Sequence, residues 1–156
     1  MIVIDIPGFR TLNLKHLVVD YNGTLAVDGR LLDGVESRLA ALANELDLHV
    51  VTGNTYGDAR DHLRGCPVEV VCLPFAGQAL AKSEYVRRLD ADRVAAIGNG
   101  RNDTLMLEHA ALSIVVLGTE GVATTALEVA DVVVRHVVDG LGLLLRPKRL
   151  ISTLRS

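Results

Sequence analysis

The sequence predicts a single α/β domain with a Rossmann-like three-layer fold, in which helices cover both faces of a mostly parallel sheet. Short apolar runs typical of strands alternate six times with stretches of helical periodicity, and the connections between them are short. Hydrophobic residues make up 49% of the chain but aromatic residues only 3%, so Val, Leu, Ile and Ala must build the core, as in buried parallel strands. A chain of 156 residues is long enough for one such domain.

The first two elements are expected to form an N-terminal β-hairpin. Residues 2–6 and 10–14 are β-prone runs, and Pro7-Gly8-Phe9 between them supplies turn geometry. The hairpin is rich in Val, Ile and Leu, which makes it a candidate contact surface for a homo-oligomer, either a dimer or a tetramer. The alternative is that it covers the edge of the sheet within one chain.

The core, residues 15–145, alternates strands with helices. We expect strands at residues 16–20, 48–52, 68–72, 93–97, 112–117 and 131–134. We expect helices at residues 34–46, 56–63, 77–89, 102–110, 121–130 and 138–145. In the first helix, for example, Val35, Leu39 and Leu42 fall on one face. No connection is long enough to fold into a lid, so residues 1–156 are expected to form one domain without a cap domain.

Composition and charge exclude several classes of function. The net charge is −3 and no Lys/Arg run stands out, so nucleic acid is not expected as a partner. No apolar run approaches the roughly 20 residues that cross a bilayer, so no membrane contact is expected. Cys66 and Cys72 match no zinc spacing and no secretory signal is found, which indicates a reduced, cytoplasmic protein. The basic tail, residues 146–156, is interpreted as a solvated last helix.

Ligands of open parallel sheets bind beyond the carboxyl ends of the strands. The residues at these ends are Asp20, Thr52, Leu73-Pro74, Gly98-Asn99 and Gly118-Thr119. They are therefore the first places to look for functional side chains.

Two of these strand ends carry the groups of an anion site. After the first core strand, Asp20 can face solvent, Gly23 allows close approach to a bound anion, and Thr24 can cap the next segment. A mere Asx turn is the alternative at this position. After the second strand, the Thr52 hydroxyl and the Gly53 N–H can hold phosphate oxygens, or they can simply cap the next helix.

Two further segments add charge and metal ligands. Lys82, early in the helix after the third strand, can offset the charge of a phosphoryl group, although most helical lysines are only solvated. The fourth strand runs into Gly98-Asn99-Gly100-Arg101-Asn102-Asp103. Oxygen-bearing side chains in a tight turn suit a hard cation such as Mg²⁺. Capping of the following helix by Asn102 or Asp103 is the alternative.

Taken in order, these pieces resemble the four motifs of the haloacid dehalogenase superfamily of phosphoryl-transfer enzymes. DYNGT at 20–24 resembles the first motif, VVTGN at 50–54 the second, Lys82 the third and GNGRND at 98–103 the fourth. The resemblance covers residues 15–145. The last motif and the following ADVVV stretch are especially similar to the phosphorylation domain of P-type ion-pumping ATPases, which places the chain near the small P-type ATPase-like members without a cap.

The resemblance implies a role for each matching residue. Asp20 would be the nucleophile that forms an aspartyl-phosphate. Its second oxygen would bind Mg²⁺ together with the backbone carbonyl of Asn22 and the side chain of Asn99 or Asp103. The remaining implied roles are phosphate binding by Asn22, Gly23, Thr52, Gly53 and Lys82, and support by Thr24 and Asn102.

Two amides depart from the family pattern. Hydrolases of this superfamily usually carry Asp where this chain has Asn22, and that Asp transfers protons during both half-reactions. Asn22 has no acidic proton and no basic oxygen, so catalytic proton transfer is lost there. Asn99 stands where the family often has an Asp that binds metal, and a neutral amide attracts Mg²⁺ less strongly than a carboxylate does.

Three hypotheses follow. The first is a Mg²⁺-dependent phosphohydrolase or phosphotransferase that acts through Asp20 on a small phosphorylated molecule, with slow hydrolysis because of Asn22. The second is a phosphate-binding or partner module that has lost catalysis. The third, a response-regulator-like domain, shares the sheet and the Asp but leaves GNGRND unexplained.

Overall fold

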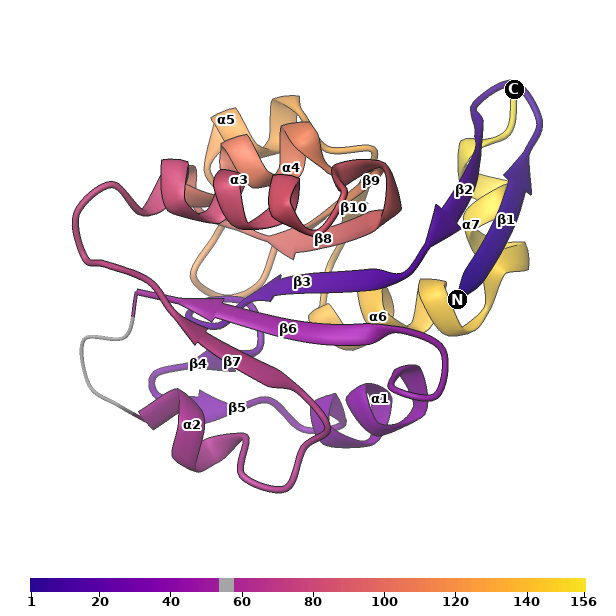
Figure 1. The fold of residues 1–156 in the computed structure, drawn as a ribbon. Helices are drawn as coiled ribbons and strands as arrows, with labels where there is room; N and C mark the ends of the chain where they lie inside the picture. The colour runs from indigo at the N-terminus through magenta and orange to yellow at the C-terminus, as the bar shows by residue number, and fades with distance from the viewer. Residues whose placement is uncertain (54–57) are drawn as a thin grey trace.

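A six-stranded parallel sheet forms the centre of the computed structural model, which describes residues 1–53 and 58–156 (Figure 1). Its strand order is β10-β9-β8-β3-β6-β7. In chain order the strands are β3 (His16–Asp20), β6 (Asp47–Thr52), β7 (Glu69–Cys72), β8 (Val94–Gly98), β9 (Leu112–Val116) and β10 (Val132–Val134). All neighbouring pairs are parallel. The predicted Rossmann-like fold is therefore confirmed.

Helices cover both faces of this sheet, and each face has its own apolar core. One face packs against α3 (Gln78–Arg88), α4 (Thr104–His109) and α5 (Thr124–Glu128). The other packs against α1 (Val35–Leu42), α2 (Asp58–His62) and α6 (Val137–Leu145). Neighbouring residues of β3 divide between the cores, since Val18 lies in the first and Val19 in the second. This period of two is what a strand buried on both faces requires.

The predicted N-terminal hairpin is present. β1 (Ile2–Ile6) and β2 (Arg10–Leu14) pair antiparallel in a sheet of their own, beside α7 (Pro147–Leu154) (Figure 1). The isoleucines of β1 are buried within the chain, whereas Val3 between them is 56% exposed. The apolar side chains that suggested an oligomer contact are thus mostly buried inside one protomer. The hairpin does not extend the main sheet, whose edge strands are β7 and β10, but packs against α7.

The basic C-terminal segment is a helix, as expected, but one face of it is not solvated. Pro147 begins α7, where its missing N–H costs nothing. Leu150 is completely buried in the core beneath the hairpin. Residues 146–156 therefore belong to the packed structure and are more than a tail.

The elements differ from expectation where short-range polar groups decide the conformation. A small ribbon, β4 (Ala26–Val27) with β5 (Arg30–Leu31), was not predicted. Asp28-Gly29 between its strands has positive φ at both residues, which is the geometry of a tight hairpin turn. Helix α1 ends at Leu42 instead of residue 46, and there the Asn44 side chain donates to the carbonyls of Ala40 and Ala41.

Two other helix starts also differ from the expected positions. Residues 101–103 form a 3₁₀ turn before α4, and α5 begins at Thr124 instead of residue 121. The first two residues of the helix expected at 56–63 lie outside the described residues. Within the described part of the chain, no helix has the length and apolar character to cross a bilayer.

Candidate active site

The carboxyl ends of β6, β3 and β8 lie side by side at the middle of the sheet, because these strands are neighbours. The chain runs outward from β3 through β6 to β7 and then returns to β8 on the opposite side of β3. This switch in strand order leaves a crevice at the end of β3. The structure accordingly brings Asp20 at the end of β3 close to the segment that begins at Asn99.

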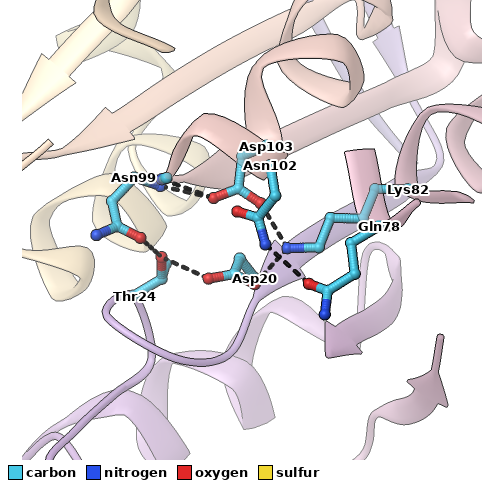
Figure 2. Close-up of polar contacts among 8 residues, drawn as sticks. Asp20, Thr24, Gln78, Lys82, Asn99, Asn102 and Asp103 are labelled. Carbon is cyan, nitrogen blue, oxygen red and sulfur yellow. Dashed lines mark hydrogen bonds and ion pairs between the residues drawn. The ribbon is translucent and has the colours of Figure 1, made fainter. Parts of the chain in front are cut away.

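Lys82 joins Asp20 to Asp103 (Figure 2). Its Nζ donates to Asp20 Oδ1 at 2.6 Å and to Asp103 Oδ1 at 2.7 Å. Helix α3 brings the lysine from the adjacent layer, and its side chain is completely buried. An ordinary surface lysine is thereby ruled out, and the three charged residues form one cluster, as the sequence motifs predict.

Lys82 carries one positive charge between the carboxylates of Asp20 and Asp103, so the buried cluster has excess negative charge when both are ionised. Burial, and next the Asp103 carboxylate, raise the pKa of Asp20 from 3.8 to about 7, although Lys82 acts in the opposite direction. Burial alone would lower the pKa of Lys82, but the two carboxylates outweigh burial and raise it. Lys82 therefore stays protonated, while Asp20 holds a proton far more readily than an exposed aspartate does.

We expect the Asp20 carboxyl of the metal-free protein to be half ionised near pH 7. Carbon-detected NMR of the side-chain carboxyl during a pH titration measures this directly. Because the pKa is higher in the folded than in the unfolded chain, ionisation of Asp20 should also lower stability as pH rises from 3.8 to about 7. If the Asp20 carboxyl titrated at about 4, like an unperturbed aspartate, burial and Asp103 would not raise its pKa.

Asp103 fixes the loop after β8. Its Oδ2 accepts hydrogen bonds from the backbone N–H groups of Asn99 at 3.0 Å and Gly100 at 2.8 Å, while Oδ1 accepts from Lys82. The side chain has no exposed surface. Most of its acceptor capacity is therefore used inside the protein, and the residue positions both Lys82 and the loop.

Gly98, at the end of β8, is required by the position of Asp103. A Cβ at residue 98 would lie 2.6 Å from Asp103 Cγ and 2.7 Å from its Oδ2. The buried carboxylate cannot move aside without losing its partners. Gly98→Ala should therefore lower the free energy of unfolding by about 1–3 kcal/mol, the usual cost of overpacking.

Denaturant unfolding measures the Gly98 effect, and Gly142→Ala in α6 is the matched control. A Cβ at Gly142 meets no atom within 4 Å, so its replacement in a helix should be neutral or stabilising. Equal effects of the two substitutions would show that Asp103 does not restrict residue 98.

Thr24 connects Asp20 to Asn99 (Figure 2). Its hydroxyl lies 3.2 Å from Asn99 Oδ1 and 3.4 Å from Asp20 Oδ2, and its single hydrogen can be shared between them. The amide group of Asn99 also donates to the carbonyl of Gly121 at 3.1 Å. Thr24 thus lies between the side-chain oxygen of Asn99 and the carboxylate of Asp20.

The loop after Asp20 is a tight turn whose own amides are partly satisfied. Gly23 has a φ of +77°, and its N–H donates to the carbonyl of Ala26 at 2.7 Å. Gly23 therefore shapes the turn, and its amide is already paired within the loop. Asn22 is exposed, and its side chain forms no hydrogen bond among the described residues.

A cavity of about 220 Å³ opens above Asp20. The described residues that line it are Asp20, Asn22, Gly53, Gln78, Asn99, Gly100, Asn102 and Glu120. Asn102 lies on its wall and donates to Gln78 Oε1 at 2.9 Å (Figure 2). Thr52 is buried at the end of β6, next to Gly53 on the cavity wall.

Sequence reasoning did not single out Gln78 and Glu120. Gln78 is the first residue of helix α3. Glu120 follows Gly118-Thr119, one of the strand ends where functional residues are expected. The available signal was thus position alone, because neither residue belongs to a motif.

The oxygen atoms at this site are of the kind that binds a hard cation. They are Oδ2 of Asp20, which has only a long contact with Thr24, the backbone carbonyl of Asn22 and the side-chain oxygen of Asn99, all at or beside the cavity. Their negative charge is low, and the described residues contain no group of three or more His, Cys, Asp or Glu side chains able to hold a metal. The set therefore fits Mg²⁺ with water or phosphate completing its coordination.

Two solved structures with the same fold are described as phosphatases. The cobalt-bound deoxy-D-mannose-octulosonate 8-phosphate phosphatase of Haemophilus influenzae superposes with a TM-score of 0.72 at 13% identity, over 92% of this chain and 94% of that one. The 3-deoxy-D-manno-octulosonate 8-phosphate phosphatase of Moraxella catarrhalis, in complex with magnesium, phosphate and KDO, gives a TM-score of 0.67 at 17% identity, over 92% of this chain and 94% of that one. No family model matches the sequence.

A curated relative matches at the level of sequence. The uncharacterized protein MJ0073 of Methanocaldococcus jannaschii is 36% identical over 85 residues, which are 52% of this chain and 91% of that protein. A related structure was identified in Legionella pneumophila as a HAD superfamily hydrolase of subfamily III A, with a TM-score of 0.72 at 17% identity over 91% of this chain and 87% of that one. The chain therefore belongs to the same family as MJ0073 and has the fold of the haloacid dehalogenase superfamily.

Proposed function

We propose that this protein is a Mg²⁺-dependent phosphohydrolase or phosphotransferase that forms an aspartyl-phosphate on Asp20. The observation that carries the proposal is the placement of this carboxylate on a cavity of about 220 Å³, with the Lys82 ammonium 2.6 Å away. Solved phosphatases of the same fold contain cobalt in one case and magnesium with phosphate in another, which supports a divalent cation and a phosphorylated substrate here.

In the proposed reaction, an oxygen of Asp20 attacks the phosphorus of a small phosphate ester or acyl phosphate. The bond from phosphorus to the leaving oxygen breaks, and that oxygen departs with its electron pair. The Gly53 N–H and the Thr52 hydroxyl hold phosphoryl oxygens, and the protonated Lys82 offsets negative charge beside Asp20. Asp103 takes no part in bonding and keeps Lys82 in place.

The cation would be held by Asp20, the carbonyl of Asn22 and the side chain of Asn99. Between the two alternatives left open by the sequence, the structure favours Asn99 over Asp103, because the oxygens of Asp103 already accept from Lys82, Asn99 and Gly100. When bound, the cation supplies positive charge that offsets the charge of the phosphoryl group.

The second candidate, a phosphate-binding module without turnover, is favoured by one observation. Among the described residues that line the cavity, the position two residues after Asp20 carries an amide that cannot transfer a proton. Phosphorylation from a good leaving group needs no such transfer, whereas hydrolysis of the phosphoenzyme does. The two candidates therefore differ in whether Asp20 becomes phosphorylated at all.

Incubation with acetyl phosphate and Mg²⁺, followed by intact mass spectrometry, separates them. We expect one added phosphoryl group on the wild type and none on Asp20→Asn. Asp92→Asn, which removes an exposed carboxylate at the amino end of β8, should be labelled like the wild type. Labelling without release of phosphate indicates a transferase or a stalled enzyme, and absence of labelling supports the binding module.

Assembly and location stay predictions. We propose a homodimer or homotetramer, in which a neighbouring copy covers the open cavity, and a cytoplasmic location. Analytical ultracentrifugation tests the first proposal, and a mass equal to one chain at all concentrations would contradict it.

A further inference from the structure

The walls of the cavity differ in charge from its floor. Lys82 lies below the floor, and its ammonium donates to both Asp20 and Asp103. Among the described residues that line the cavity, none is Lys, Arg or His. The part of a substrate that projects beyond the phosphoryl group would therefore meet amides and one further carboxylate, Glu120.

Glu120 lies close to the nucleophile loop. If Gly23 carried a Cβ, this atom would be 2.5 Å from Glu120 Oε2 and 2.8 Å from Asn99 Nδ2. The Glu120 carboxylate is thus near Asn99, directly over the turn that follows Asp20. It is exposed, and it forms no ion pair or side-chain hydrogen bond with any described residue.

The loop that carries Glu120 is attached to the site. Asn99 Nδ2 donates to the carbonyl of Gly121, and the N–H of Ala123 donates to the carbonyl of Asn99 at 2.9 Å. These bonds fix the backbone on the C-terminal side of Glu120. The carboxylate therefore belongs to the cavity wall, and because no described residue pairs with it, it is able to pair with a ligand.

Gln78 provides hydrogen-bond donors on another part of the wall. Its Oε1 accepts from Asn102, so its amide nitrogen is left to donate. That nitrogen lies against Gly53, only 1.9 Å from the place where a Cβ of residue 53 would stand. A hydroxyl or other oxygen acceptor of a substrate can bind there, next to the phosphoryl position.

From this wall chemistry we propose, on the basis of the proposed function, that the substrate is the phosphate ester of a small amino alcohol or amino sugar. Glu120 pairs with the ammonium group, and Gln78 donates to a hydroxyl oxygen. A leaving group that bears a carboxylate or a second phosphate meets the negative charge of Glu120 with no cation to offset it. Glu120 is thus a specificity-determining residue of the site.

Three phosphonates of nearly equal size test the charge preference without turnover. They are aminopropylphosphonate, hydroxypropylphosphonate and carboxyethylphosphonate, whose distal groups are cationic, neutral and anionic. Calorimetry with the full chain and Mg²⁺ should show affinity falling in that order. We expect about tenfold between the first and the last, the size suited to a partly exposed charge pair in which attraction becomes repulsion.

Glu120→Gln should remove most of this difference, and Glu120→Lys should reverse the order. Glu128→Gln, which removes an exposed carboxylate on α5, should leave the order as in the wild type. An order that is unchanged in Glu120→Gln, tighter binding of the carboxylate compound, or no binding of any of the three overturns the inference. Acetyl phosphate labelling of Asp20 reports on the proposed function separately, so failure of one is distinguishable from failure of the other.

Discussion

Replacement of Lys82 by methionine should lower the free energy of unfolding by about 3–5 kcal/mol, the range measured when one member of a buried ion pair is removed. Methionine fills similar space, so the cost comes from the charge. Asp20 and Asp103 would remain in the same buried place without their shared cation. The variant should also be phosphorylated far more slowly, because the ammonium that offsets negative charge beside Asp20 would be missing.

Urea unfolding at neutral pH measures the stability change, and Lys148→Met on the exposed side of α7 is the matched control. The variant Lys82→Met/Asp20→Asn should recover part of the loss, since only one buried carboxylate then remains. The loss should also shrink as pH falls, because the pKa of Asp20 is raised in the folded chain and protonation of this carboxyl therefore favours folding. A cost below about 1 kcal/mol, as for an exposed pair, would contradict this assignment.

Replacement of Asn22 by aspartate should accelerate hydrolysis of the phosphoenzyme by about 10²–10⁴-fold, the usual contribution of general acid–base catalysis. The side chain is exposed and lines the cavity of Asp20, so a carboxylate there can take a proton from an attacking water. Phosphorylation by acetyl phosphate should change much less, because its leaving group needs no proton.

The lifetime of the labelled protein after removal of acetyl phosphate gives the hydrolysis rate, and released phosphate gives the turnover. Asn22→Ala is the control that removes the amide without adding a carboxylate, and its phosphoenzyme should persist. The double variant Asn22→Asp/Asp20→Asn should show no label. If Asn22→Asp leaves the lifetime unchanged, proton transfer at residue 22 does not limit hydrolysis of the phosphoenzyme.

The sheet and the position of the candidate nucleophile could be predicted because both depend on local patterns. Each of the six core strands begins and ends within one residue of the expected position. In β3, β6 and β8, for example, the apolar run ends at Asp20, Thr52 and Gly98. A parallel sheet then places all strand ends at one edge. Asp20 and Asn99 had to lie near each other once β3 and β8 were neighbours.

The contribution of Gln78, Glu120 and Asp103 could not be predicted in the same way. Gln78 and Glu120 meet the site through contacts between segments far apart in the chain, and nothing in the surrounding sequence marks them. The sequence left Asp103 as either a metal ligand or a helix cap. Only the backbone course from Gly98 to Gly100 shows that its carboxylate turns inward, toward two amides and Lys82.

Because Lys82 is buried, its presence in relatives of this protein can be explained by stability alone. Because Lys82 joins the helical layer to the central strand, its loss would lower the stability of a relative even if that relative had no catalytic activity. The presence of Lys82 and Asp103 in a relative would therefore not indicate that the relative is catalytically active. The exposed residues 22 and 120 are under no such structural constraint. Whether they vary among relatives is therefore better evidence for or against a role in the proposed reaction.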